Sequence, residues 1–452
     1  MKHFDLAIIG TGSGNAIPEE LNDASIALIE AGRFGGTCLN VGCIPTKMYV
    51  YPADVIEDAK AAHELGVDLS YHGVDLPLLQ DRIFGRRIDV IAEGGERYRK
   101  DECPNITVFS DMARFTGDKT IEVAGEHITA DQIIVAAGSR PQIPDLVTDS
   151  GVPYYTNEDI MRIERLPKRL LILGSGYIAT EFAHVFSALG SKVMVTGRSD
   201  VLIKHQDRDV AVRFTRAARE RWDVRLGQET TGLTKDGDTI TLTFADGSTA
   251  TGDALLVATG RIPNGDRLNL AAAGIDTHGD GRIKVDQHGR TSAAGVWALG
   301  DVSSPYQLKH VANHEARVVF HNVTHPEKLR SFRHDALPAA IFTHPQIASV
   351  GMSEQEARDA GYDIAVATQN FGDVAYGWAM EDHVGFSKII ADKKTGLILG
   401  AHLMGHQSAI LIQSLIQAMA LGTTAKQMAE DQLWIHPSLS EVIENCLLGL
   451  EL

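Results

Sequence analysis

The chain has 452 residues, which is too long for one ordinary hydrophobic core and predicts roughly two to four domains. Its formal net charge of −17 argues against nucleic acid or an anionic membrane as a partner. There is no run of about twenty apolar residues, and the N-terminal LAIIG is too short for the core of a signal peptide. We therefore expect a cytoplasmic protein that does not enter a membrane.

The N-terminus has the pattern of a dinucleotide-binding βαβ unit. Residues 4–10 (FDLAIIG) predict a buried strand that ends in glycine, and residues 26–30 (IALIE) predict a second strand. Between them stand Gly10, Gly12 and Gly14, which allow a tight turn and let backbone N–H groups approach a pyrophosphate. The pattern indicates that the first strand, turn and helix bind one dinucleotide.

Two further positions of this unit carry information. Glu30 ends the second strand, where an acid can bind the hydroxyls of a ribose. Asn15 occupies the third position of the glycine fingerprint, where glycine or alanine is usual. We therefore expect looser packing between helix and strand at this point.

The same pattern recurs after residue 169. A strand, LLIL, leads into Gly174, and Gly176 and Ala179 complete a second fingerprint. Each fingerprint is followed later by a strand that ends in alanine and glycine, the first at Gly138 and the second at Gly260. One module has therefore been used twice, with the second copy inserted into the first, and two dinucleotides are expected.

The second module differs from the first in the charge that follows its second strand. No acid ends the stretch SKVMVTG; Arg198 stands there instead, and Lys204 follows. Cations at this place suit a 2′-phosphate, which favours NADPH over NADH. The alternative is that both are solvated surface charges.

Two cysteines lie close together in GGTCLNVGCIPTK, although the chain has only four. A disulfide between Cys38 and Cys43 requires Cα atoms roughly 4.4–6.8 Å apart, so the segment must be coiled. Pro45 suits the first turn of a helix that begins near Cys43, and a helix N-terminus stabilises a thiolate. A zinc site would need a second pair of ligands, but Cys103 and Cys446 stand alone. The pattern favours a redox-active pair over zinc or a structural disulfide.

Together these motifs, in this order, resemble the FAD-dependent pyridine nucleotide–disulfide oxidoreductases, a family that includes glutathione reductase and dihydrolipoamide dehydrogenase. The resemblance implies FAD and NADPH as cofactors and an α/β fold with two nested Rossmann-like domains and a C-terminal α+β dimerisation domain. The expected limits are 1–146 and 266–335 for the FAD domain, 147–265 for the NADPH domain and 336–452 for dimerisation.

The resemblance also implies roles for individual residues. Cys43 would lie nearer the flavin and form a charge-transfer thiolate, while Cys38 would attack the substrate disulfide. Lys47 would lie beside the flavin and pair with Glu181, and Tyr177 would cover the flavin when nicotinamide is absent. The alternatives are an ordinary buried ion pair and simple packing of the tyrosine.

Further FAD contacts are expected from Thr37, next to the first cysteine, and from Asp301 in ALGD. Asp301 follows a buried strand and a glycine, so it could instead cap a helix.

An acid–base group is needed because thiol–disulfide exchange leaves a sulfur that must gain a proton. His436 lies in HPSLSE, and Glu441 stands five residues later, where it can orient the imidazole. This matches the family's C-terminal His–Glu pair, which comes from the other subunit. The resemblance therefore implies an obligate homodimer with shared active sites.

The substrate is expected to be a small-molecule disulfide. The stretches GTGSGN, GGTCLNVGCIPTKM, YTNEDIMRIERLP and QLWIHPSLSEVIEN resemble the branch of the family that reduces mycothione, the disulfide of a cysteine-bearing pseudo-disaccharide. Glutathione disulfide and dihydrolipoamide remain alternatives. Two other classes stay open: an NAD(P)H oxidase or quinone reductase, against which the cysteines and the His–Glu pair argue, and a non-catalytic NADPH-binding protein.

Overall fold

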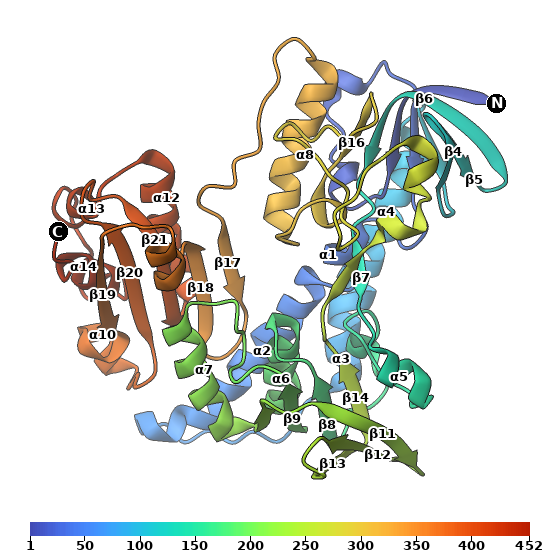
Figure 1. Cartoon of the computed structure of the whole chain (residues 1–452). Helices are drawn as coiled ribbons and strands as arrows, with labels where there is room; N and C mark the ends of the chain where they lie inside the picture. The colour runs from blue at the N-terminus through green and yellow to red at the C-terminus, as the bar shows by residue number, and fades with distance from the viewer.

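The computed structural model describes residues 1–452, which form three lobes (Figure 1). The N-terminal strands and α8 lie in one lobe, the green segments of the middle of the chain in a second, and the red C-terminal segments in a third. Among the helices, none combines the length and apolar character that crossing a bilayer requires. The α-helices outside the second and third lobes' sheets, described below, are α1 (Gly36–Asn40), α2 (Cys43–Ala61), α3 (Leu76–Gln80), α4 (Asp89–Arg97), α5 (Asp145–Ser150) and α8 (Lys309–Thr324).

The first lobe contains a seven-stranded sheet with a parallel centre. Its order is β3-β2-β1-β6-β5-β4, and β16 pairs with β6. The strands are β1 (Lys2–Ile9), β2 (Ile26–Ile29), β3 (Ile106–Phe109), β4 (Arg114–Gly117), β5 (Thr120–Val123), β6 (Glu126–Val135) and β16 (Val296–Ala298). Because β16 returns to this sheet after the whole second module, the predicted insertion of one module into the other is confirmed.

The connection from β1 to β2 corrects the βαβ prediction, since it contains no α-helix. Two short 3-10 turns replace the helix. Arg99 donates from Nε to Oδ1 of Asn15 (2.9 Å) and from Nη2 to its carbonyl oxygen (3.0 Å). That carbonyl is therefore engaged outside a helix, and Pro18 offers no N–H.

Gly14, rather than position 15, supplies the close packing in this connection. A Cβ at Gly14 would lie 2.9 Å from Cβ of Ala136 and 3.0 Å from Cγ2 of Ile8. The expectation of looser packing caused by Asn15 is therefore wrong.

The second lobe repeats the module with its helix intact. A four-stranded parallel sheet has the order β10-β9-β8-β14, and a three-stranded antiparallel sheet, β11-β12-β13, accompanies it. The elements are β8 (Arg169–Leu173), α6 (Tyr177–Leu189), β9 (Lys192–Gly197), α7 (Arg208–Arg221), β10 (Asp223–Leu226), β11 (Thr230–Asp236), β12 (Thr239–Phe244), β13 (Thr249–Gly252) and β14 (Ala254–Val257). The short strands β7 (Ser139–Pro141) and β15 (Arg261–Pro263) pair antiparallel where the chain passes between the two modules.

The third lobe is an antiparallel five-stranded sheet with helices, as the α+β prediction requires. The strand order is β17-β18-β21-β20-β19. Its elements are β17 (Pro338–Ile341), β18 (Gln346–Gly351), α9 (Glu354–Asp359), β19 (Ile364–Asn370), α10 (Ala375–Ala379), β20 (Phe386–Asp392), β21 (Ile398–Gly405), α11 (Ser408–Leu411), α12 (Gln413–Leu421), α13 (Ala425–Glu430) and α14 (Glu441–Leu448). Cys446 is buried in α14, in the apolar core of this lobe.

Candidate active site

A cavity of about 1190 Å³ lies where the first glycine turn, the cysteine segment, α6 and the start of the third lobe meet. The predicted residues that line it are Gly10, Gly12, Glu30, Thr37, Cys38, Cys43, Gly138, Tyr177, Glu181 and Asp301. The predicted residues outside it are Gly14, Asn15, Lys47, Gly174, Gly176, Ala179, Arg198, Lys204, Gly260, His436 and Glu441. Residues from distant parts of the chain thus meet around one space that is large enough for a dinucleotide.

The two modules make the same turn at the end of their first strand. Gly10 has φ +104° and Gly174 has φ +133°. A Cβ at Gly10 would overlap the carbonyl oxygen of Ala136, and a Cβ at Gly174 would overlap that of Ala258. Only glycine fits both the conformation and the close approach.

The walls of the cavity fit FAD. A Cβ on Gly36 would lie 2.7 Å from Cα of Gly12, so two bare backbone segments touch where a pyrophosphate can approach them. Glu30 accepts from the N–H of Thr11 (2.9 Å), which fixes its carboxylate against the glycine turn. Asp301 accepts from Oγ of Ser139 (2.7 Å) and lines the cavity without capping the 3-10 turn in which it lies. Both carboxylates can accept from hydroxyl groups of the cofactor.

The cysteine pair is placed as the sequence predicts, because α2 begins at Cys43 and Pro45 lies in its first turn. Both thiols are free in this structure. The Cys43 thiol donates to Cys38, Lys309 lies nearby, and the N–H groups of Cys43 and Ile44 face the same sulfur. These interactions, the first above all, lower the pKa of Cys38 to about 7.

The pKa of Cys43 moves the other way. Its hydrogen bond to Cys38 raises the pKa of the Cys43 thiol, and burial raises it further. The lower pKa fits Cys38 as the attacking group. The charge-transfer role of Cys43 stays a prediction.

Lys309 is a residue of this cavity that the sequence reasoning did not identify. It is the first residue of α8, and its Nζ donates to Oγ of Ser13 in the first glycine turn (2.9 Å). A cation at a helix N-terminus opposes the helix dipole, so its position has no benefit for the helix itself. Since only the fold brings α8 beside Cys38, no local sequence signal could have found it.

Lys47 and Glu181 do not form the direct ion pair that the resemblance implies. Glu181 accepts from the backbone N–H of Phe342 (3.0 Å), and Nζ of Lys47 lies 3.9 Å from the centre of the Phe342 ring. Burial raises the pKa of Glu181 to about 7, although Phe342 and Lys47 oppose this change. The two charges therefore act on each other through space, with Phe342, which the sequence reasoning also missed, between their contacts.

The residues predicted for NADPH lie on the second module. Gly176 precedes α6, and no atom lies within 4 Å of a Cβ built on it. Ala179 is fully buried, which gives the close helix packing that the fingerprint requires. Arg198 and Lys204 are exposed and form no ion pair. Gly260 has φ +145° just before β15.

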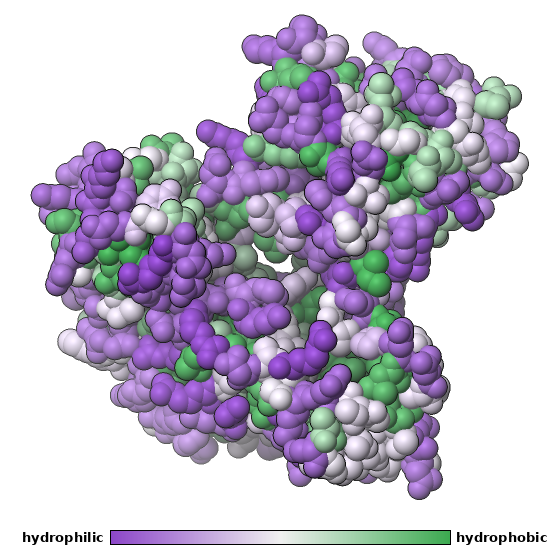
Figure 2. Space-filling model, viewed as in Figure 1, coloured by the Kyte–Doolittle hydropathy of each residue, from purple (hydrophilic) through white to green (hydrophobic).

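His436 and Glu441 form a pair on the third lobe. Nδ1 of His436 lies 2.7 Å from Oε1 of Glu441, and the His436 side chain is 68% exposed. The hydrogen bond from His436 lowers the pKa of Glu441. Leu433 and Ile435, just before the histidine, are exposed, and Figure 2 shows apolar side chains at the surface of this lobe.

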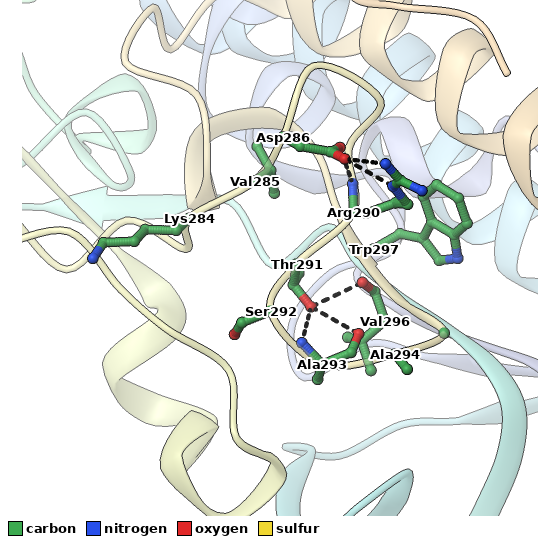
Figure 3. A pocket seen from close by; sticks show the side chains of 11 residues that line it. Lys284, Val285, Asp286, Arg290, Thr291, Ser292, Ala293, Ala294, Val296 and Trp297 are labelled. Carbon is green, nitrogen blue, oxygen red and sulfur yellow. Dashed lines mark hydrogen bonds and ion pairs between the residues drawn. The ribbon is translucent and has the colours of Figure 1, made fainter.

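A second hollow, of about 570 Å³, lies beside residues 284–297 (Figure 3). Asp286 is paired with Arg290 (2.7 Å), and Oγ1 of Thr291 donates to the carbonyl oxygen of Val296 (2.9 Å). The polar groups drawn there serve the loop's own conformation, and the hollow holds no nucleophile.

Comparison with known proteins agrees with this geometry. Residues 4–316 match the family described as pyridine nucleotide-disulphide oxidoreductase, and residues 337–446 match its dimerisation domain. The chain belongs to this family. It is an oxidoreductase of the disulfide-reductase type, and FAD and NADPH are its cofactors.

Individual relatives cover the chain almost completely. It is 50% identical to a mycothione reductase from Mycobacterium tuberculosis, over 100% of both chains. A dihydrolipoyl dehydrogenase from Thermus scotoductus is 33% identical, over 98% of this chain and 96% of its own. Among solved structures, the HOCl-induced flavoprotein disulfide reductase RclA from Escherichia coli has a TM-score of 0.86 at 28% identity, covering 98% of this chain and 99% of its own.

Proposed function

We propose that this enzyme reduces mycothione to two molecules of mycothiol at the expense of NADPH. The observation that carries the proposal is the cavity that combines the FAD-type glycine turn with both cysteines. The choice of mycothione rests on the full-length identity of 50% to a mycothione reductase.

The cysteines supply the chemistry toward the substrate. FAD, when bound, passes electron pairs from NADPH to the cysteine pair. From the dithiol form, the Cys38 thiolate attacks one substrate sulfur, the substrate S–S bond breaks, and a mixed disulfide forms. The sulfur of Cys43, after losing its proton, then attacks that of Cys38 and releases the second thiol, so that Cys38 and Cys43 end as a disulfide.

The first departing thiolate needs a proton. We assign its donor to His436 of the partner subunit, since the histidine of the same chain does not line its cavity. The exposed Leu433 and Ile435 beside the histidine support burial against a second copy, as does the match to a dimerisation domain. Glu441 orients the ring and stabilises its charged form. The proposal is thus a homodimer that shares its active sites.

The other site assignments belong to the same proposal. Arg198 and Lys204 bind the 2′-phosphate of NADPH, and their exposure without ionic partners supports this. The domain limits given above are supported by the pairing of β7 with β15, where the chain passes between the modules. A cytoplasmic location is proposed as well, because the cysteines must cycle through the reduced form.

The test is the rate of NADPH oxidation by the purified holoenzyme with mycothione, glutathione disulfide or lipoamide supplied separately. We expect kcat/KM for mycothione to exceed the other two by at least about 100-fold, since pocket contacts distinguish substrates on this scale. Equal turnover of glutathione disulfide or lipoamide would contradict mycothione as the substrate while leaving the disulfide chemistry in place.

A further inference from the structure

Lys388, on β20 of the third lobe, is 2% exposed and contacts three carboxylates. Its Nζ lies 3.0 Å from Oδ1 of Asp207, 2.6 Å from Oδ2 of Asp209 and 2.8 Å from Oε2 of Glu354. Burial alone would lower the pKa of Lys388, but the three carboxylates raise it, so the side chain is charged. A buried cation from the third lobe thus holds two acids of the second lobe.

Asp207 marks the end of a loop with a role in nucleotide binding. It caps α7 by accepting from the N–H of Asp209 (3.0 Å), and it also accepts from the N–H of Glu354 (3.1 Å). Residues 198–206 lie between β9 and this cap, and they carry both proposed phosphate ligands, Arg198 and Lys204.

The start of the same loop is held by the second glycine fingerprint. The N–H of Ile203 donates to the carbonyl oxygen of Ser175 (2.7 Å), and the hydroxyls of Ser175 and Ser199 lie 3.2 Å apart. The loop is therefore fixed at two places, one inside the nucleotide-binding module and the other at Lys388.

We propose that Lys388 is a positioning residue for NADPH, through which the third lobe fixes the loop that recognises the 2′-phosphate. This rests on the proposed function of Arg198 and Lys204. Without the ammonium group, Asp207 and Glu354 would face each other as buried carboxylates, and their repulsion would displace the end of the loop. Lys388 touches neither the nucleotide nor the cysteine cavity, so its effect reaches NADPH only through Asp207.

The experiment compares kcat/KM for NADPH with kcat/KM for NADH in the holoenzyme carrying Lys388→Met. We expect the NADPH-to-NADH ratio to fall about tenfold, which is the scale of one misplaced charge-assisted phosphate contact. Lys388→Arg keeps the charge and is expected to restore most of the ratio. A purely structural role would lower both values together.

Two further variants calibrate the result. Asn370→Ala removes another contact between the same lobes, where Nη2 of Arg213 donates to Oδ1 of Asn370 (3.0 Å), and it should leave the ratio as in the wild type. Arg198→Ala tests the phosphate site itself. If Arg198→Ala changes the ratio and a folded Lys388→Met does not, the positioning role is overturned and the phosphate site stands.

If Arg198→Ala leaves the ratio unchanged, both proposals are overturned. Should Lys388→Met fail to fold, Asp209→Asn provides a milder change, because Asp209 is mostly exposed and donates its backbone N–H unchanged. We expect this variant to lower the ratio about two- to threefold, and an unchanged ratio would count against the role of Lys388.

Discussion

Nδ1 of His436 lies 2.7 Å from Oε1 of Glu441, and neither residue lines the cavity that holds the cysteines of the same chain. An acid–base pair on one lobe and a thiol pair in another cavity can serve one reaction only if two chains combine. The shared active site therefore makes a prediction about mixed dimers.

A heterodimer of one Cys38→Ser chain and one His436→Gln chain has one site with both defects and one site with neither. We expect each homodimeric variant to be nearly inactive and the purified heterodimer to regain about half of the wild-type rate. Differently tagged chains, co-expressed and purified through both tags, allow this measurement. An inactive heterodimer would show that each chain uses its own histidine.

The position of Lys309 predicts the pH dependence of the reactivity of Cys38. Because the pKa of Cys38 is lowered to about 7, its thiolate fraction, and with it the rate of alkylation by iodoacetamide, should rise through that pH. Lys309→Met removes a positive charge and should move the midpoint up by about half a pH unit. Lys309→Arg is the charge-preserving control. The reduced enzyme is alkylated across pH 5–9 and the labelled peptide is identified. Equal midpoints in wild type and Lys309→Met would exclude an influence of this lysine.

Two glycines of the second fingerprint should fail in different ways. Gly174→Ala places a Cβ against the carbonyl of Ala258 at φ +133°, so its melting temperature should fall, with a cost of roughly 1–3 kcal/mol or more. Gly176→Ala meets no atom within 4 Å and should melt like the wild type, but it should raise KM for NADPH because the nucleotide needs the bare backbone. Thermal unfolding and steady-state kinetics on both variants separate the two effects. A normal melting temperature for Gly174→Ala would refute the steric explanation.

Glu181 should make stability depend on pH. Its pKa is raised from 4.5 to about 7 by burial, so the folded state favours the protonated form. Below pH 4.5 both states are protonated and the cost is absent, whereas above pH 7 it is fully present, at roughly 3 kcal/mol at most. Glu181→Gln should therefore gain stability over the wild type at pH 8 and little at pH 5. Urea unfolding at both pH values measures this, and a variant that is no more stable at pH 8 would contradict it.

The sequence was most informative where a local conformation requires a particular residue. Gly10 and Gly174 adopt positive φ beside a neighbouring strand, and α2 begins at Cys43 with Pro45 in its first turn. Such features depend on few neighbouring residues, so spacing was enough to predict them. The repetition of the strand–turn pattern likewise predicted the nested modules.

Features that depend on distant partners were beyond the sequence. The missing helix after β1 reflects the contact of Arg99 with Asn15, and these residues are far apart in the chain. Lys309 reaches the cysteine cavity only because α8 packs on the first module, and Phe342 lies between the contacts of Lys47 and Glu181 only because β17 ends there. No periodicity or motif reports such contacts.

The most direct test of the central claim is to count products in one reaction. With mycothione and the wild-type holoenzyme, we predict two thiols formed for each NADPH oxidised, and no thiol from the Cys38→Ser variant. Oxidation of NADPH with hydrogen peroxide as the product and no thiol released would contradict the account and identify an oxidase instead.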